Sequence, residues 1–404
     1  YKVTATEIRE TTEATNYVWE NKVIPHRIRL SGDYFRIAKD GEGAYPWRIE
    51  VLRNDSPFFN YLINTSRLYW RKEMEERFKE DAEAAEAYAR AHRFRIDGEG
   101  LAPEETAEQM QNLVNKIFTI GYLCHRHKEK SRAWPPIAMD NKVDEEGQCN
   151  GGTGKTVFFS VLNHYLRSLQ LDGKQKDSDK DRHKFEQVDK HTDLIFVDDC
   201  NKDFTVEEYY SVITGEMPIN VKHKTRFNLA FEDSPKIAFS TNYVPLEFSP
   251  STQRRLIFLV FSDYYHAASE DNDYRETRKV STDFGHDLYG VKYSHEEWQA
   301  DLNFIMQCTR FYLSHMATNP DEPIQPPMDN IYLRRHMAVM GPVFWDWAKK
   351  YFAPDSGNLD REIKREVAFE AYRMDTKQMN AKMRGFTNRL KAFVKVADWV
   401  EEYN

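Results

Sequence analysis

The first third of the chain carries apolar residues at helical spacing. Residues 57–93 and 103–124 each show one apolar face, and the charge-rich part of the former predicts a helix with a solvated side. Short strand-like runs at residues 34–37 and 47–51 predict two strands before these helices. We therefore expect residues 1–134 to form a mainly helical accessory or oligomerisation domain.

A different pattern begins after Pro135 and Pro136. Runs of consecutive apolar residues, typical of strands buried on both faces, alternate here with helical stretches. Strands separated by helices indicate an α/β fold with a parallel sheet, and we expect this sheet to form the core of a domain spanning residues 135–275. The predicted strands span residues 137–139, 194–197, 237–239 and 256–261, and a helix is predicted over residues 157–169.

Helical spacing returns in the last part of the chain. Residues 298–316 predict one helix, and the segments after Pro326 and Pro327 predict three short helices followed by a short strand. We expect residues 276–404 to form a C-terminal helical region that is winged-helix-like from about residue 330. The elements of its final part span residues 343–352, 367–372, 386–393 and 394–400.

The stretch Gly147-Gln-Cys-Asn-Gly-Gly-Thr-Gly-Lys-Thr156 lies between a predicted strand and a predicted helix. Glycines let a backbone turn tightly and point successive N–H groups at a phosphate. In the G-x-x-x-x-G-K-[ST] pattern, Lys155 would reach the β- and γ-phosphates and the Thr156 hydroxyl would hold Mg²⁺. Cys149 stands where that pattern has glycine. The residues predicted to bind the nucleotide are Asn150, Gly151, Gly152, Thr153, Gly154, Lys155 and Thr156.

Polar residues stand at the ends of the predicted strands. Asp198 and Asp199 follow one strand and Asn242 follows another, while Arg254 and Arg255 precede a third. Ligands bind at the carboxyl ends of parallel strands. Hydrolysis of a nucleoside triphosphate needs a carboxylate for Mg²⁺, a group that orients water and a cation against the transferring phosphoryl. We predict that these five residues are catalytic.

Each of these signals also has an ordinary structural explanation. A double aspartate after a strand often forms a turn or caps a helix, and Ser-Thr-Asn is common turn chemistry. An arginine pair before a strand is usually surface charge. Their order behind a phosphate loop favours ATP hydrolysis, with Thr156, Asp198 and Asp199 holding Mg²⁺.

Composition and charge narrow the class of protein. The formal net charge of −8 leaves no overall basic surface for nucleic acid, so DNA binding would need a local patch or a channel. The four cysteines are scattered without a Cys-x-x-Cys pair, which argues against a disulfide framework and a zinc site. No run of about 18 apolar residues predicts a membrane span. These features predict a cytoplasmic protein without a membrane partner.

In order and spacing, the motifs resemble those of the superfamily 3 helicases. These are AAA+ motors of small viruses, phages and plasmids, and they include poxvirus-type primase-helicases. The resemblance implies a P-loop NTPase core in which Lys155 and Thr156 match the Walker A residues. The motifs that carry it are Gly151-Gly-Thr-Gly-Lys-Thr156, Leu194-Ile-Phe-Val-Asp-Asp199, Ile237-Ala-Phe-Ser-Thr-Asn242 and Gln253-Arg-Arg255.

The same resemblance assigns roles to the strand-end residues. Asp198 and Asp199 match the Walker B pair, and Asn242 matches the sensor asparagine. Arg255, in preference to Arg254, matches the finger arginine that acts on the nucleotide of a neighbouring subunit. A ring, most simply a hexamer, is therefore implied.

Family members also carry a hairpin whose basic residues enter a central channel and grip DNA. Its place here holds Ile219-Asn-Val-Lys-His-Lys-Thr-Arg-Phe227. On a strand, Lys222, Lys224 and Arg226 would share one face, and His223 could hydrogen-bond a phosphate. An exposed hairpin with ordinary surface charge is the alternative.

The predicted function is that of an ATP- and Mg²⁺-dependent DNA helicase of a phage or other mobile element. It would encircle single-stranded DNA during replication in the cytoplasm of a bacterial host. No residues resemble a primase active site, so a primase module would lie elsewhere in the same polypeptide or in a partner. Two alternatives remain open: an ATP-binding replication initiator or scaffold without processive unwinding, and an AAA+ remodeller of proteins.

Overall fold

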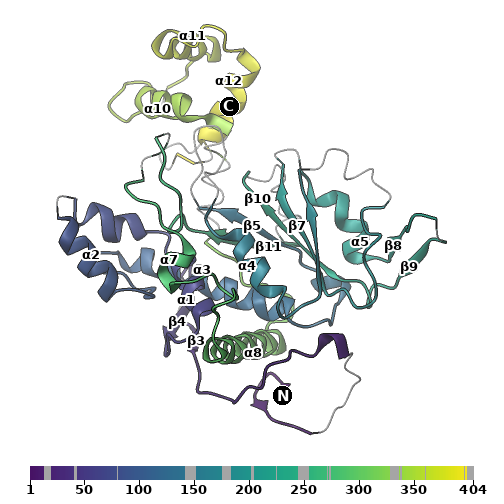
Figure 1. Cartoon of the computed structure of the whole chain (residues 1–404). Coiled ribbons are helices and arrows are strands. Elements are labelled where there is room, and N and C mark those ends of the chain that lie inside the picture. Colours follow the sequence, from purple (N-terminus) through teal and green to yellow (C-terminus); the bar gives the residue numbers. More distant parts are fainter. Residues whose placement is uncertain are drawn as a thin grey trace. The chain divides into compact units, whose positions relative to one another are not determined.

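Two compact units make up the chain (Figure 1). The first contains residues 1–141 and 151–327, and the second contains residues 142–150 and 328–404. The predicted accessory region, the predicted sheet and the helix predicted near residue 300 all lie in the first unit. The computed structural model describes residues 1–12, 20–40, 43–79, 81–141, 152–174, 183–201, 204–223, 225–243, 254–270, 272, 274–327, 336, 339–359, 361–394 and 396–397.

A five-stranded parallel sheet forms the core of the first unit, as the pattern of apolar runs predicts. Its strand order is β11-β5-β10-β7-β6, and every residue of β5, β10 and β11 is buried. Strands buried on both faces need continuous apolar runs, which is what their sequences supply. The strands are β5 (Pro136–Asp140), β6 (Ser168–Asp172), β7 (Leu194–Cys200), β10 (Lys236–Thr241) and β11 (Ile257–Phe261). The predicted α/β fold class is confirmed.

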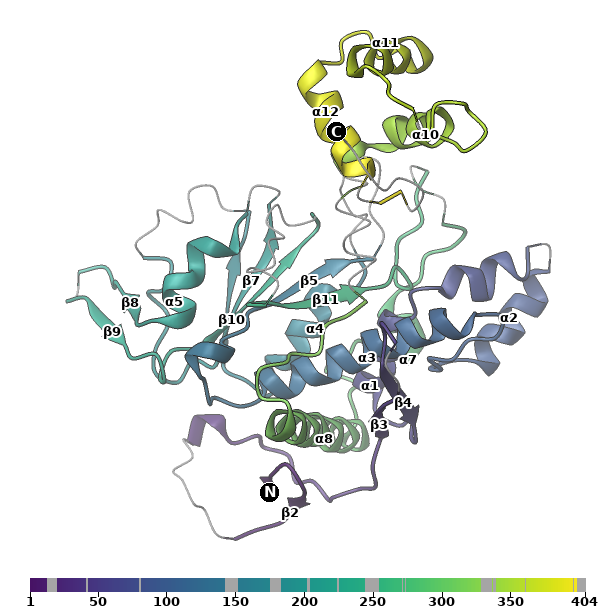
Figure 2. The same ribbon diagram turned by 180° about the vertical axis from the view of Figure 1, so that it is seen from behind.

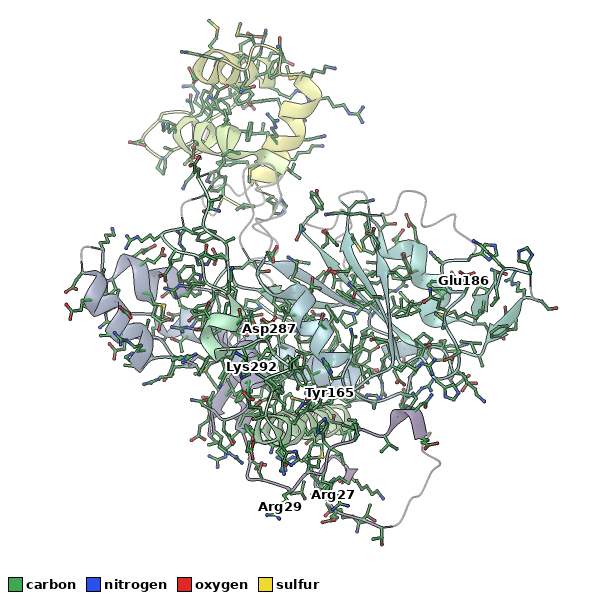
Figure 3. The ribbon with its side chains drawn as sticks, viewed as in Figure 1. Arg27, Arg29, Tyr165, Glu186, Asp287 and Lys292 are labelled. Carbon is green, nitrogen blue, oxygen red and sulfur yellow. The ribbon has the colours of Figure 1, made fainter. Side chains whose placement is uncertain are left out.

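One edge strand of this sheet is missing from the sequence prediction. The helix after the phosphate loop, α4 (Lys155–Leu162), is shorter than the predicted 157–169, and residues Ser168–Asp172 pair with β7 as strand β6. Because β6 is an edge strand and half-exposed, its sequence lacks the apolar run of a central strand. Tyr165 keeps an apolar role outside the helix, since its ring packs against Tyr289 (Figure 3).

Helix α3 (Pro103–Leu123) packs against strand β11, and α8 (His295–Thr318) packs against α3. The two helices lie side by side in both ribbon views (Figures 1 and 2). A Cβ added to Gly121 would lie 2.3 Å from the carbonyl oxygen of Cys308. Glycine at this position therefore permits the close approach of the two helices.

The predicted helical stretch 57–93 is broken into three segments. These are α1 (Pro57–Ser66), the π-helical turn η2 (Lys72–Glu76) and α2 (Ala82–Ala91). The break falls where Arg67 and Glu73 form an ion pair with fully buried side chains. The burial of a charged pair outweighs the helix propensity of the intervening residues.

Short elements complete the first unit. The hairpin of β3 (Phe35–Lys39) and β4 (Trp47–Val51) confirms the two predicted strands. Figure 1 shows a second hairpin, β8 (Met217–Ile219) and β9 (Phe227–Leu229), projecting beyond α5 (Tyr210–Thr214). The other elements among the described residues are β1 (Lys2–Val3), β2 (Ile8–Arg9), η1 (Glu20–Lys22), η3 (Lys130–Arg132), η4 (Val206–Tyr209) and α7 (Val280–Phe284).

The second unit has its own apolar core, to which three helices of its described residues contribute. These helices are α10 (Pro342–Tyr351), α11 (Arg365–Thr376) and α12 (Met383–Val394), and their packed side chains include Phe344, Tyr372 and Phe386. The strand predicted at residues 394–400 falls mostly outside the described residues, so a winged-helix ending stays a prediction. No helix in the described part of either unit is long and apolar enough to span a bilayer.

A buried carboxylate ties α8 to the beginning of α1. Asp301 accepts hydrogen bonds from the Ser56 hydroxyl at 2.6 Å, the Tyr293 hydroxyl at 2.5 Å and the Phe58 amide at 3.2 Å. Burial raises the pKa of Asp301 from 3.8 to about 6. The folded state therefore holds a proton at pH values where the unfolded state has lost it.

This raised pKa predicts a pH-dependent stability. As pH rises from 4 to 7, the native chain should lose up to ~3 kcal/mol of unfolding free energy relative to the Asp301→Asn variant, because the folded state must ionise a buried group. Denaturant unfolding at several pH values measures the difference. Asp287→Asn, at an exposed acid labelled in Figure 3, is the control and should run parallel to the native protein. The prediction is contradicted if the unfolding free energies of Asp301→Asn and of the native protein change with pH in the same way.

Candidate active site

The phosphate loop enters helix α4 through a left-handed glycine. Gly154 caps the helix with φ 101°, and Lys155 is the first helical residue. A Cβ at position 154 would lie 2.7 Å from the hydroxyl oxygen of Tyr61, which donates a hydrogen bond of 2.6 Å to the Gly154 carbonyl. Both the backbone angle and the space therefore require glycine. Among the other predicted loop residues, Gly152 has φ 76°, and Asn150 and Gly151, like Cys149, lie outside the described residues.

Asp140 joins the predicted loop residues, although the sequence analysis did not single it out. It ends strand β5, and its carboxylate accepts hydrogen bonds from the Lys155 ammonium at 2.5 Å and from the Thr153 hydroxyl. All three side chains are buried. A polar residue at the carboxyl end of a buried strand was the available signal, and it is the same signal that identifies Asp198.

A β-bulge presents both aspartates of β7 at the carboxyl edge of the sheet. Val197 pairs with Phe239 and Cys200 with Thr241, so Asp198 and Asp199 face a single residue of β10. Asp199 adopts φ 57°, a left-handed conformation that aspartate tolerates better than most residues. Neighbouring residues of a regular strand point to opposite faces, and the bulge removes that restriction.

Ser240, the residue opposite the bulge, fixes both aspartates. Its hydroxyl donates to Asp198 Oδ1 at 2.5 Å and accepts a hydrogen bond of 2.8 Å from the Asp199 amide. Asp198 also accepts a bond of 3.0 Å from the side-chain amide of Gln170 on β6. Neither Ser240 nor Gln170 was predicted, because one lay within a turn-like motif and the other in an unpredicted strand.

The bulge brings three predicted site residues together with the loop. The Thr156 hydroxyl lies 3.3 Å from Asp198 Oδ1, and Asn242 donates a bond of 2.9 Å to Asp199 Oδ1. Lys174, which was not predicted, forms an ion pair with Asp199, and this hydrogen-bonded pair raises the pKa of Lys174. The second aspartate is thus held between an amide and a cation.

The oxygens of Thr156 and Asp198 fit the preferences of Mg²⁺. This ion binds through one or two protein oxygens together with phosphate and water oxygens. A site composed entirely of protein ligands is not required, and the described residues hold no group of three or more His, Cys, Asp or Glu side chains that could bind a metal. Thr156 and Asp198 are therefore suited to share an ion with a nucleotide.

The two predicted arginines lie away from this edge. Arg254 and Arg255 precede β11, which runs parallel to β5 with Ile257 opposite Pro136. They stand at the amino edge of the sheet, on the order of 15 Å along the strands from Asp140. Both are exposed, and the Arg255 guanidinium lies 5.5 Å from the ring centre of Tyr210. The arginines are thus not part of the cluster within their own chain.

The predicted basic hairpin exists, but its cations occupy the loop instead of a strand. Strands β8 and β9 end at Ile219 and begin at Phe227, so Lys222, His223 and Arg226 lie between them. The expectation that Lys222, Lys224 and Arg226 share one strand face is wrong for Lys222 and Arg226, because both lie outside the three residue pairs of the ladder. Lys222 and Arg226 make no ion pair with any described side chain and are exposed. Lys224 lies outside the described residues.

Comparisons with known proteins give distant structural similarities. No protein-family model matches the sequence, and no curated protein matches it. The apo C-terminal region of NrS-1 is 12% identical over 72% of this chain and 68% of that chain, with a TM-score of 0.35. A second structure of that region is 11% identical over 84% of this chain and 66% of that chain, with a TM-score of 0.30. A structure of JCV helicase with a bound acetamide compound is 9% identical over 65% of this chain and 55% of that chain, with a TM-score of 0.26. Since all three TM-scores lie below 0.5, these structures do not establish a shared fold.

The contact of Tyr61 with the loop predicts an effect on nucleotide binding. Tyr61→Phe removes the hydrogen bond to Gly154 and should weaken ADP binding about fivefold, since a net hydrogen bond contributes about 1 kcal/mol. Calorimetric titration with ADP measures the change. Tyr265→Phe is the matched control. The Tyr265 ring stacks on the Tyr61 ring, but its buried hydroxyl donates to Asp283 and not to the described loop residues. Equal affinities for the two variants would contradict the prediction.

Proposed function

We propose that the chain hydrolyses ATP with Mg²⁺ and uses this reaction to unwind DNA as a ring, most simply a hexamer. The observation that carries the proposal is the meeting of loop and strand-end residues at the carboxyl edge of one parallel sheet. Lys155 and Thr156 come from the loop, Asp198 and Asp199 from the bulge, and Asn242 from the end of β10. This edge is where ligands bind in such sheets.

Each residue has a task in phosphoryl transfer. The backbone of residues 152–155 and the Lys155 ammonium bind the phosphates, and Thr156 with Asp198 holds Mg²⁺, which neutralises phosphate charge. Asp199 accepts a hydrogen bond from the attacking water and so orients it, while Asn242 keeps that carboxylate in place. Ser240 holds the geometry of both aspartates.

The position of Arg255 supports action between subunits. A finger arginine must reach the transferring phosphoryl, but this one lies at the opposite edge of its own sheet. In a ring, the amino edge of one subunit can face the site of the next. Mixing the Arg255→Ala and Lys155→Ala proteins tests the arrangement, since mixed interfaces would contain one intact site and one intact finger. Mixtures as inactive as either parent would exclude action in trans.

The loop between β8 and β9 supports DNA as the partner. Its exposed cations Lys222 and Arg226 would be repeated by every subunit and would thereby be concentrated in a channel, despite the net charge of −8. The Lys222→Ala/Arg226→Ala variant should lose strand separation and retain basal ATPase activity. Lys292→Ala, at an exposed lysine labelled in Figure 3, is the control for a lost surface charge. Unchanged unwinding by the loop variant would contradict a DNA-gripping role.

The two alternatives make different predictions. An initiator or scaffold that uses ATP for assembly would bind DNA and hydrolyse ATP without separating strands. A protein remodeller would show ATPase activity that ignores single-stranded DNA. We favour the helicase of a phage or other mobile element, with priming supplied by a module in cis or in trans, because the order of the motifs matches that family.

A further inference from the structure

Asp140 is bonded to Lys155, the residue that is predicted to bind the nucleotide phosphates. Its carboxylate is 1% exposed and lies at the end of β5, directly below the loop. The Lys155 ammonium is 2.5 Å from Asp140 Oδ2, and the Thr153 hydroxyl donates to Oδ1. One carboxylate therefore binds two side chains of the same phosphate loop, on either side of Gly154.

The pair is costly to separate. A buried ammonium and a buried carboxylate each lose hydration, and either charge is costly once its counter-charge is removed. A ligand that draws Lys155 away from Asp140 must therefore bring an anionic group to the same ammonium. A β- or γ-phosphate can do so because the lysine of this loop pattern reaches those groups. A neutral ligand or a single α-phosphate does not reach it.

We propose that Asp140 is a positioning residue for Lys155 that sets the affinity of the site for nucleotides with a β-phosphate. This inference rests on the proposed function, because it assigns Lys155 to the nucleotide phosphates. In the nucleotide-free protein, Asp140 holds Lys155 and Thr153 in place. When nucleotide binds, the β-phosphate replaces the carboxylate as the partner of Lys155, and the buried carboxylate keeps the Thr153 hydroxyl but loses its counter-charge. Asp140 thus lowers the affinity for nucleotides with a β-phosphate and leaves the affinity for AMP unaffected.

The Asp140→Asn variant separates charge from shape. The asparagine oxygen can still accept the Thr153 hydroxyl, but the amide no longer offers an anion to Lys155. We expect ADP to bind about tenfold more tightly to this variant than to the native chain, which corresponds to ~1.4 kcal/mol. Affinity for AMP should stay unchanged, because AMP has no β-phosphate. Calorimetric titrations with ADP and AMP, each with Mg²⁺, provide the comparison.

Asp172→Asn is the matched control for a charge at the same edge. Asp172 ends the edge strand β6 and is exposed, and its carboxylate accepts a bond from the Lys174 amide. Its replacement removes one negative charge near the site without releasing Lys155. The ADP affinity of this variant should therefore remain within about twofold of the native value, since exposed charges are screened by solvent and salt.

The outcomes distinguish the inference from the proposed function. Equal or weaker ADP binding by Asp140→Asn, or an equal gain for AMP, would overturn the role of Asp140 while leaving the nucleotide site intact. Failure of the folded native chain to bind ADP or ATP would instead overturn the proposed function. If Asp140→Asn does not fold, Asp140→Ser removes the same charge with a hydroxyl in place for Thr153, and the same gain for ADP alone is expected.

Discussion

Asp198→Asn should abolish nucleotide hydrolysis and leave nucleotide binding measurable. Asparagine has the size of aspartate and can keep an oxygen toward the Ser240 hydroxyl, so the bulge should survive. The variant loses the negative charge that would hold Mg²⁺ together with Thr156. Because metal stabilisation of a phosphoryl transition state amounts to several kcal/mol, the rate should fall on the order of hundredfold or more. Steady-state phosphate release measures this effect.

The control for this prediction is an aspartate near the amino ends of the parallel strands. Asp233 precedes β10 and is exposed, so Asp233→Asn should leave hydrolysis unchanged. ADP titrations in EDTA should give similar affinities for the native chain and for Asp198→Asn. Hydrolysis by Asp198→Asn within about threefold of the native rate would remove this carboxylate from the mechanism.

The second large effect concerns stability. Arg67 and Glu73 form an ion pair of 2.6 Å in which neither side chain is exposed, and Glu73 Oε1 also accepts a bond of 2.8 Å from the Tyr88 hydroxyl. Glu73→Ala leaves a buried guanidinium without its carboxylate. The free energy of unfolding should fall by about 3–5 kcal/mol, because an uncompensated buried charge is strongly destabilising. Denaturant unfolding measures it.

An exposed ion pair with the same N···O distance serves as the comparison. Arg36 and Glu50 also lie 2.6 Å apart, on β3 and β4, but their side chains are 71% and 59% exposed. Glu50→Ala should therefore change the unfolding free energy by less than about 1 kcal/mol. Replacing both buried partners, as Arg67→Met/Glu73→Leu, should cost less than Glu73→Ala alone. Similar losses for Glu73→Ala and Glu50→Ala would show that burial does not set the cost.

The elements that could be predicted are those whose signal lies in their own residues. Buried central strands such as β10 and β11 need unbroken apolar runs, and α3 needs an apolar face over its whole length. Strand β6 depends instead on a partner distant in the sequence, and the break after α1 depends on the burial of a charged pair. One pairs with β7, and the other surrounds the buried ion pair of Arg67. Local periodicity contains neither requirement.

The candidate site divides in the same way. Residues with a motif or a strand-end position, such as Lys155, Asp198 and Asn242, could be identified from the sequence and do come together. Tyr61 could not, because nothing in the sequence indicates that α1 touches the loop. The bulge that places both Asp198 and Asp199 at the carboxyl edge could not be predicted from the sequence either, since it arises from the pairing of β7 with β10. The roles assigned to these residues stay predictions.

The most direct test of the central claim is the rate of ATP hydrolysis by the purified chain with and without single-stranded DNA. The geometry of the sheet edge predicts Mg²⁺-dependent turnover that Asp198→Asn removes, and the β8–β9 loop predicts stimulation by single-stranded DNA that Lys222→Ala/Arg226→Ala reduces. Absence of turnover in a folded, nucleotide-loaded assembly would contradict hydrolysis at this site. Turnover that ignores single-stranded DNA would contradict the helicase.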